Sequence, residues 1–116
     1  MLNKPSNIPP LKIVLADDSP LNRMLWVSLF QDWWPGIKID QASDGVDLVD
    51  LVQNNRYDVV LTDIMMPNMD GIEAVKFIRN FNPFVPIIGI SGNSAREYTD
   101  ELIDVGFTSY VTKPIE

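Results

Sequence analysis

Short apolar runs alternate with helical patterns along the whole sequence, and this alternation constrains the fold more than any other feature. The apolar runs cover residues 11–16, 37–42, 57–63, 87–90 and 109–112. Helical patterns lie between them, over residues 20–33, 45–54, 72–81 and 95–105. This order predicts an α/β domain with a doubly wound sheet of five parallel strands, joined by right-handed crossovers and covered by helices on both faces.

The length of 116 residues fits a single core. We expect a polar, Pro-rich N-terminal extension over residues 1–10 and one domain over residues 11–116. A last strand in such a fold is usually followed by a covering helix. The sequence stops at Glu116, so we expect the final helix to be missing and part of one sheet face to lack its cover.

Composition excludes several functional classes. The net charge of −7 argues against a nucleic-acid or anionic-membrane surface. Cys and His are both absent, which removes disulfides, thiolate sites, Ser-His-Asp catalysis and the commonest zinc ligand. We expect a cytoplasmic location, because a chain without Cys fits a reducing compartment and neither a signal peptide nor a membrane-spanning run is seen.

Charged side chains follow three of the predicted strands. Asp17 and Asp18 follow the first strand, Asp63 ends the third, and Lys113 follows the fifth. The carboxyl ends of parallel strands meet at one edge of the sheet, where such folds bind ligands. Sites built only from oxygen ligands favour hard cations such as Mg2+. The sequence therefore predicts a metal and phosphate site at this edge.

Each acid also has an ordinary structural explanation. Asp17 and Asp18 precede a helix and are candidates to cap it, and Asp63 is a candidate to begin a turn. Neither explanation accounts for the convergence of three acids and a lysine. For Asp70-Gly71, in contrast to these acids, turn and helix-entry chemistry is a better explanation than ligand binding.

With these residues in place, the sequence resembles the receiver domain of two-component response regulators over residues 11 to 116. Five signatures agree in order and spacing: the Asp17-Asp18 pair, Asp63 within LTDIMMPNMDG, Ser91, Tyr110 and Lys113-Pro114. The residues around Asp63 look most like those of receivers attached to hybrid sensor kinases. The resemblance implies the flavodoxin-like strand order 2-1-3-4-5.

The resemblance also implies a role for each acid. Asp63 would accept a phosphoryl group from a histidine kinase or phosphotransfer protein. Asp18, Asp63 and the backbone carbonyl of Met65 would hold Mg2+ directly, and Asp17 would act mainly through water.

Three further residues take roles by resemblance. Lys113 would pair with Asp63 before phosphorylation and with a phosphate oxygen after it, and Ser91 would donate a hydrogen bond to another phosphate oxygen. Tyr110 would turn inward when Ser91 moves, which makes this pair the expected conformational switch. Ordinary alternatives remain: a solvated lysine, a loop serine and a half-buried strand tyrosine.

The first helix carries three tryptophans: Trp26, Trp33 and Trp34. One or two aromatic residues of this helix are expected to fill the core beside the sheet, with Trp26 or Phe30 as the candidates. The others predict a contact with a partner protein, with a second copy of the chain as a homodimer, or with residues 8–10, since Trp is enriched at interface hot spots.

Three other functions compete with a phosphoryl-accepting signalling module. A Mg2+-dependent phosphohydrolase with an aspartate nucleophile usually has a second Asp two residues later, where this chain has Met65. A nucleotide-binding domain would need a Gly-rich phosphate loop, and neither G-x-G-x-x-G nor G-x-x-x-x-G-K-[ST] occurs. A degenerate receiver that serves only as an interaction module keeps the fold without the phosphorylation.

Overall fold

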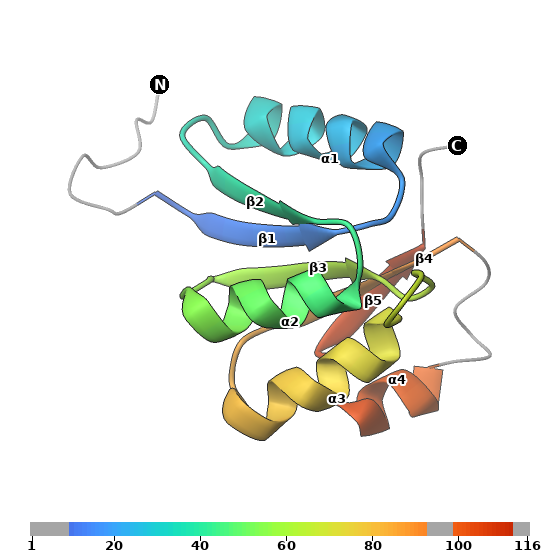
Figure 1. The fold of residues 1–116 in the computed structure, drawn as a ribbon. Coiled ribbons are helices and arrows are strands. Elements are labelled where there is room, and N and C mark those ends of the chain that lie inside the picture. The colour runs from blue at the N-terminus through green and yellow to red at the C-terminus, as the bar shows by residue number, and fades with distance from the viewer. Residues whose placement is uncertain (1–9, 93–98, 113–116) are drawn as a thin grey trace.

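The computed structural model describes residues 10–92 and 99–112, which form a parallel sheet with helices on both faces (Figure 1). The elements in chain order are β1 (Lys12–Ala16), α1 (Pro20–Trp33), β2 (Lys38–Ala42), α2 (Gly45–Asn54), β3 (Val59–Asp63), α3 (Gly71–Phe81), β4 (Ile87–Ser91), α4 (Thr99–Val105) and β5 (Ser109–Thr112). The five strands lie in the order β2-β1-β3-β4-β5, and every neighbouring pair is parallel. The predicted fold class and strand order are confirmed.

Side-chain caps set where three of the helices begin. The hydroxyl of Ser19 accepts a hydrogen bond from the Asn22 amide at the start of α1 (3.2 Å). Asp44 and Asp70 do the same for α2 and α3. These caps satisfy amides that the first helical turn leaves without a partner. The prediction that Asp70 serves helix entry is therefore confirmed.

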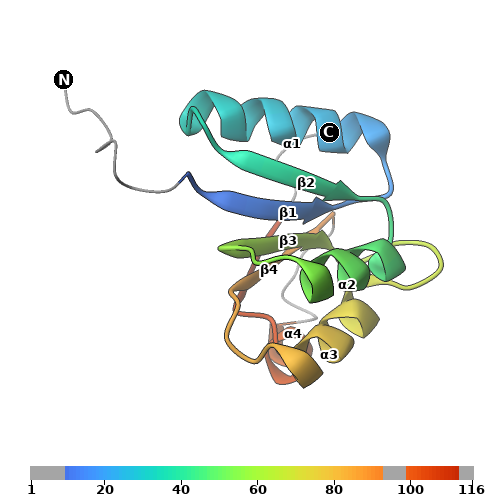
Figure 2. The same ribbon diagram turned by 60° about the vertical axis from the view of Figure 1, so that its left-hand side comes forward.

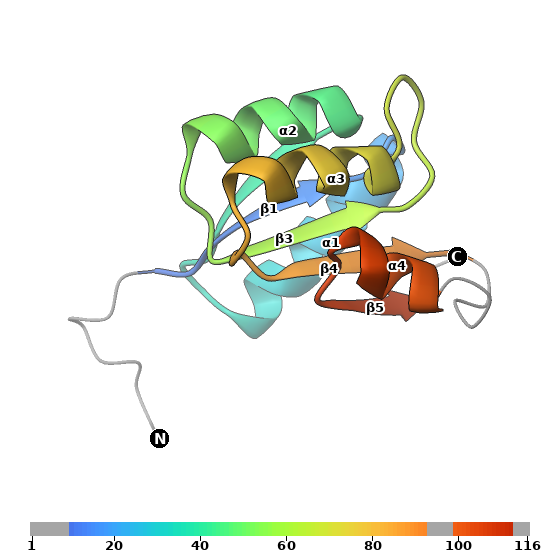
Figure 3. The same ribbon diagram turned by 90° about the horizontal axis from the view of Figure 1, so that it is seen from below.

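Two hydrophobic clusters fill the space on either side of the sheet. Helix α1 covers one face, and α2, α3 and α4 cover the other (Figures 2 and 3). Leu48, Val75 and Leu102, one from each of the three helices, are fully buried in the larger cluster. The smaller cluster places Trp26 of α1 against apolar residues of β1, β3 and β4. Strands β1 and β3 supply buried residues to both clusters, as their continuous apolar runs predicted.

The face under α1 is only partly filled within the described residues. A pocket of about 270 Å³ opens there, lined by Trp26, Phe30, Leu61, Ile88, Val111 and Thr112. Residues 113–116 lie outside the described part of the chain, so the expectation that part of this face lacks its cover stays a prediction. No helix in the described part of the chain has both the length and the apolar character needed to cross a membrane.

Some predicted boundaries fall outside the described residues. Residues 1–9 are among them, so the division into an extension over 1–10 and a domain over 11–116 stays a prediction. The fourth helix was predicted over 95–105, and the structure describes it from Thr99 onward.

Candidate functional site

Three carboxylates meet at the C-terminal edge of the sheet. Asp63 is the last residue of β3, and Asp17 and Asp18 directly follow β1. One oxygen from each carboxylate lies within 4.8 Å of the others. We call these three residues the acidic trio. Asp17 and Asp63 are buried, whereas Asp18 is exposed, so the trio opens to solvent on one side.

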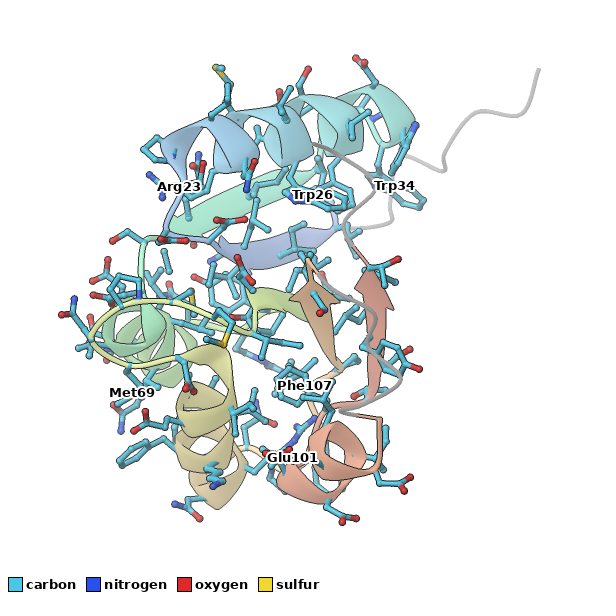
Figure 4. The ribbon with its side chains drawn as sticks, turned by 90° about the vertical axis from the view of Figure 1, so that its right-hand side faces the viewer. Arg23, Trp26, Trp34, Met69, Glu101 and Phe107 are labelled. Atoms are coloured by element: carbon cyan, nitrogen blue, oxygen red, sulfur yellow. The ribbon has the colours of Figure 1, made fainter. Side chains whose placement is uncertain are left out.

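The loop between β1 and α1 is held by hydrogen bonds that fix Asp17. The Asp17 amide donates to the Ala42 carbonyl at the end of β2 (3.1 Å). Its carboxylate Oδ1 accepts from the Ser19 amide (2.9 Å), and its carbonyl accepts from Nη1 of Arg23 (2.6 Å). Figure 4 shows Arg23 on the first part of α1, at this edge of the sheet.

These contacts show that neither Asp17 nor Asp18 is the residue that caps α1. Ser19 caps α1, and Asp17 closes a turn onto the Ser19 amide. The side chain of Asp18 is therefore not used as the helix cap, which leaves it available to a ligand at the edge of the sheet.

Asp63 is anchored where β3 runs into the loop of residues 64–70, here called the β3–α3 loop. Its Oδ1 accepts a hydrogen bond from the Met65 amide (3.3 Å). The Gly71 amide donates to the Ile64 carbonyl (2.9 Å), which brings the start of α3 back against the end of β3. A Cβ at Gly71 would lie 2.3 Å from the Asp63 carbonyl oxygen, so this approach requires glycine.

Two of the remaining predicted residues lie on β4 and β5, on one side of β3 in the sheet. Ser91 is the last residue of β4, is 7% exposed and pairs in register with Thr112 of β5. Tyr110 lies opposite Gly89 in the same strand pair and packs, half-buried, against the larger hydrophobic cluster. Their switch roles stay predictions. Lys113 lies outside the described residues, so its predicted contact with Asp63 also stays a prediction.

Two residues that the sequence analysis did not single out hold the β3–α3 loop. Asn68 has a φ of 65°, the one positive φ of a non-glycine residue in the described chain. Its amide Nδ2 donates to Oδ2 of Asp44 (2.7 Å), the residue that caps α2. The tendency of Asn to adopt left-handed backbone conformations was a usable signal for the turn. Nothing in the sequence pointed to the bond with Asp44.

The charge of the acidic trio fits a divalent cation bound by oxygen. Two carboxylates about 4 Å apart repel by roughly 4 kcal/mol at an intermediate dielectric constant, and two members of this trio are buried. A bound cation offsets this repulsion. Mg2+ accepts carboxylate and carbonyl oxygens and keeps several water ligands, for which the open side at Asp18 leaves room.

Comparisons with known proteins agree with the geometry. Residues 13–116 match the family described as "Response regulator receiver domain". The chain is 33% identical to the sensor histidine kinase RcsC of Escherichia coli over 105 residues, which is 90% of this chain and 11% of that protein. It thus spans about a tenth of the length of this relative.

Two solved structures share the fold. The chemotaxis response regulator CheY4 of Vibrio cholerae has a TM-score of 0.83 and 31% identity, covering 92% of this chain and 89% of that one. A CheX–CheY complex with BeF3 and Mg2+ from Borrelia burgdorferi has a TM-score of 0.84 and 28% identity, covering 92% and 81%.

Proposed function

Because the chain belongs to the response regulator receiver domain family, we propose that it accepts a phosphoryl group on Asp63 from a histidine kinase or a phosphotransfer protein, with the help of Mg2+. The observation that carries this proposal is the acidic trio, whose oxygens lie within 4.8 Å of one another at the end of β3. A receiver domain is a phosphoacceptor signalling module rather than a catalytic enzyme.

The transfer step needs only groups at this edge of the sheet. A carboxylate oxygen of Asp63 attacks phosphorus, and the bond from phosphorus to the donor atom breaks with its electron pair leaving on the donor. The product is an acyl phosphate. Mg2+, held by Asp18, Asp63 and the Met65 carbonyl, would neutralise charge on the phosphoryl oxygens. Asp17, fixed by the Ser19 amide, would orient a water ligand of that ion.

Ser91 and Lys113 would bind the phosphate once it is formed. Support for Ser91 is its position as the last residue of β4, beside β3 in the sheet, with only 7% of its surface exposed. Lys113 is proposed from the family pattern alone. Movement of Ser91 toward the phosphate would let Tyr110 turn inward and shift α4 and β5.

We also propose that the exposed end of α1 contacts a partner protein. Trp26 is buried in the smaller hydrophobic cluster, which fits the expectation that Trp26 or Phe30 fills the core. Trp33 and Trp34 are 66% and 43% exposed. Two exposed tryptophans at the end of one helix support this face as the place where a kinase, a phosphotransfer protein or a second copy binds.

The direct test is incubation with acetyl phosphate and Mg2+, followed by intact-mass measurement. We expect one added phosphoryl group on the unsubstituted chain and none on Asp63→Asn. Asp70→Asn is the matched control, since it removes a nearby carboxylate but leaves a residue that caps α3 well. This control is expected to be phosphorylated like the unsubstituted chain.

The other outcomes each contradict the proposal. A complete lack of adduct would favour the degenerate interaction module. Continuous release of phosphate over many turnovers would favour a phosphohydrolase. A beryllofluoride adduct that leaves amide chemical shifts unchanged across residues 91–112 would reject the switch assigned to Ser91 and Tyr110.

A further inference from the structure

The first turn of α2 is bonded to the β3–α3 loop at two points. Asp44 uses both carboxylate oxygens: Oδ1 accepts from the Asp47 amide within α2 (2.8 Å), and Oδ2 accepts from Nδ2 of Asn68 (2.7 Å). The Gly45 amide donates to the Met69 carbonyl (2.8 Å). Figure 4 shows Met69 beside the α2 helix.

At Gly45, the contact between α2 and the loop leaves no room for a side chain. A Cβ at Gly45 would lie 2.3 Å from the carbonyl oxygen of Met69, so α2 touches the loop backbone directly. Asn68 keeps a left-handed backbone, φ 65°, that most side chains avoid. The bonds from Asp47 and Asn68 lower the pKa of the Asp44 carboxyl, so the ionised acceptor is the form this contact favours.

The same loop carries the groups that would meet the metal. It begins directly after Asp63, and Met65, the predicted carbonyl ligand, is its second residue. The side chain of Met65 is 74% exposed and supplies no packing anchor. Within the loop, Ile64 is buried in the larger cluster and its amide donates to the Ile90 carbonyl, while Met66 and Met69 pack against the same cluster. Around Met65 the described hydrogen bonds are its own amide bond to Asp63, the Gly71 amide bond to Ile64, and the two bonds to α2.

We propose that Asp44 and Asn68 are positioning residues for the phosphoryl acceptor: their hydrogen bond holds the β3–α3 loop in the conformation that presents the Met65 carbonyl beside the acidic trio. This inference rests on the proposed function, and it adds that Mg2+ affinity depends on a contact made by α2. Neither residue touches the metal or the phosphate in this scheme.

An exchange of donor and acceptor tests the contact. Asn68→Asp faces one carboxylate with another and removes the donor. Asp44→Asn retains a good helix cap and can keep a bond to Asn68, because an amide can turn to offer its oxygen to the other amide's N–H. The double variant Asp44→Asn with Asn68→Asp restores a donor and an acceptor in the reversed order. Asp50→Asn is the charge-matched control, since Asp50 is exposed on the same helix and the bonds that it accepts come from Asn54.

The measurements are the Mg2+ dissociation constant, from amide chemical shifts, and hydrogen exchange of residues 64–71 without Mg2+. We expect Asn68→Asp to weaken Mg2+ binding several-fold and to speed exchange in the loop, and Asp44→Asn to change both by less. The double variant should recover most of both losses, and Asp50→Asn should match the unsubstituted chain. Thermal unfolding without Mg2+ should change little across the set, which separates positioning from a general loss of stability.

Two failures have different meanings. If the unsubstituted chain binds Mg2+ and Asn68→Asp binds it equally well, the positioning role is wrong while the phosphoacceptor function stands. If the unsubstituted chain binds no Mg2+, the proposed function itself is wrong, and the positioning role is wrong with it.

Discussion

At the scale of single residues, glycine decides how closely the backbone approaches Asp63. Gly71 is buried, and an added Cβ would lie 2.3 Å from the Asp63 carbonyl oxygen. Gly36 differs, since its φ of 93° is left-handed but an added Cβ would meet nothing within 4 Å. A substitution at Gly71 therefore tests steric contact at the site, whereas a substitution at Gly36 tests backbone strain away from the site.

Gly71→Ala should destabilise the protein and also impair phosphorylation. We expect a loss of about 1–3 kcal/mol in the free energy of unfolding, because the end of β3 or the start of α3 must shift. Gly36→Ala should lose roughly 1–2 kcal/mol from its left-handed backbone and be phosphorylated at the normal rate. Urea unfolding and the rate of modification by acetyl phosphate measure both effects. Equal phosphorylation rates in the two variants would show that the approach at Gly71 does not position Asp63.

The meeting of Asp63 with Asp17 and Asp18 was predictable from sequence because it follows from the pattern of strands. Asp63 ends an apolar run, and parallel strands bring their carboxyl ends together, so meeting Asp17 and Asp18 follows from the strand order. The bond between Asn68 and Asp44 was not predictable in the same way. It joins two loops 24 residues apart, and its formation depends on how closely α2 packs against the β3–α3 loop.

At the scale of elements, helix α1 divides into a buried side and an exposed end. Trp26 is 7% exposed and stacks on Phe30 with ring centroids 5.7 Å apart. Trp33 meets Phe30 edge-on at 5.9 Å but is 66% exposed. The sequence predicted that Trp26 or Phe30 would fill the core, and Trp26 is buried there. How much of the remaining surface of α1 is covered depends on neighbours that the helical pattern does not specify.

The two tryptophans should respond differently to truncation. Trp26→Ala removes a buried side chain and is expected to lose about 3–5 kcal/mol of unfolding free energy. Trp33→Ala should change it by no more than about 0.5 kcal/mol, as is usual for an exposed position. Urea unfolding followed by circular dichroism measures both without relying on tryptophan fluorescence. A large loss from Trp33→Ala in the isolated chain would mean that its side chain is covered, and the proposed binding face of α1 would have to be abandoned.

At the scale of the whole molecule, metal binding by the acidic trio would be coupled to folding. The three carboxylates come from the loop after β1 and from the end of β3, and they meet only because β1 and β3 are neighbours in the sheet. An unfolded chain has no such meeting point. A cation that binds this group therefore favours the folded state, whereas without a cation the repulsion among the three opposes it.

Mg2+ should raise the melting temperature with the logarithm of its concentration above the dissociation constant. At 100 times the dissociation constant, binding to the folded state adds about 2.7 kcal/mol, which for a domain of this size is a rise of about 10 °C. Asp18→Asn should remove most of this rise, and it should leave the melting temperature without Mg2+ unchanged or higher because one repulsive charge is gone. Asp32→Asn, an exposed acid on α1, is the charge-matched control and should keep the full response. Calorimetry at constant ionic strength separates binding from screening. An equal rise in Asp18→Asn and in the control would place the stabilising cation outside the acidic trio, since only a site that uses Asp18 loses affinity when that carboxylate is removed.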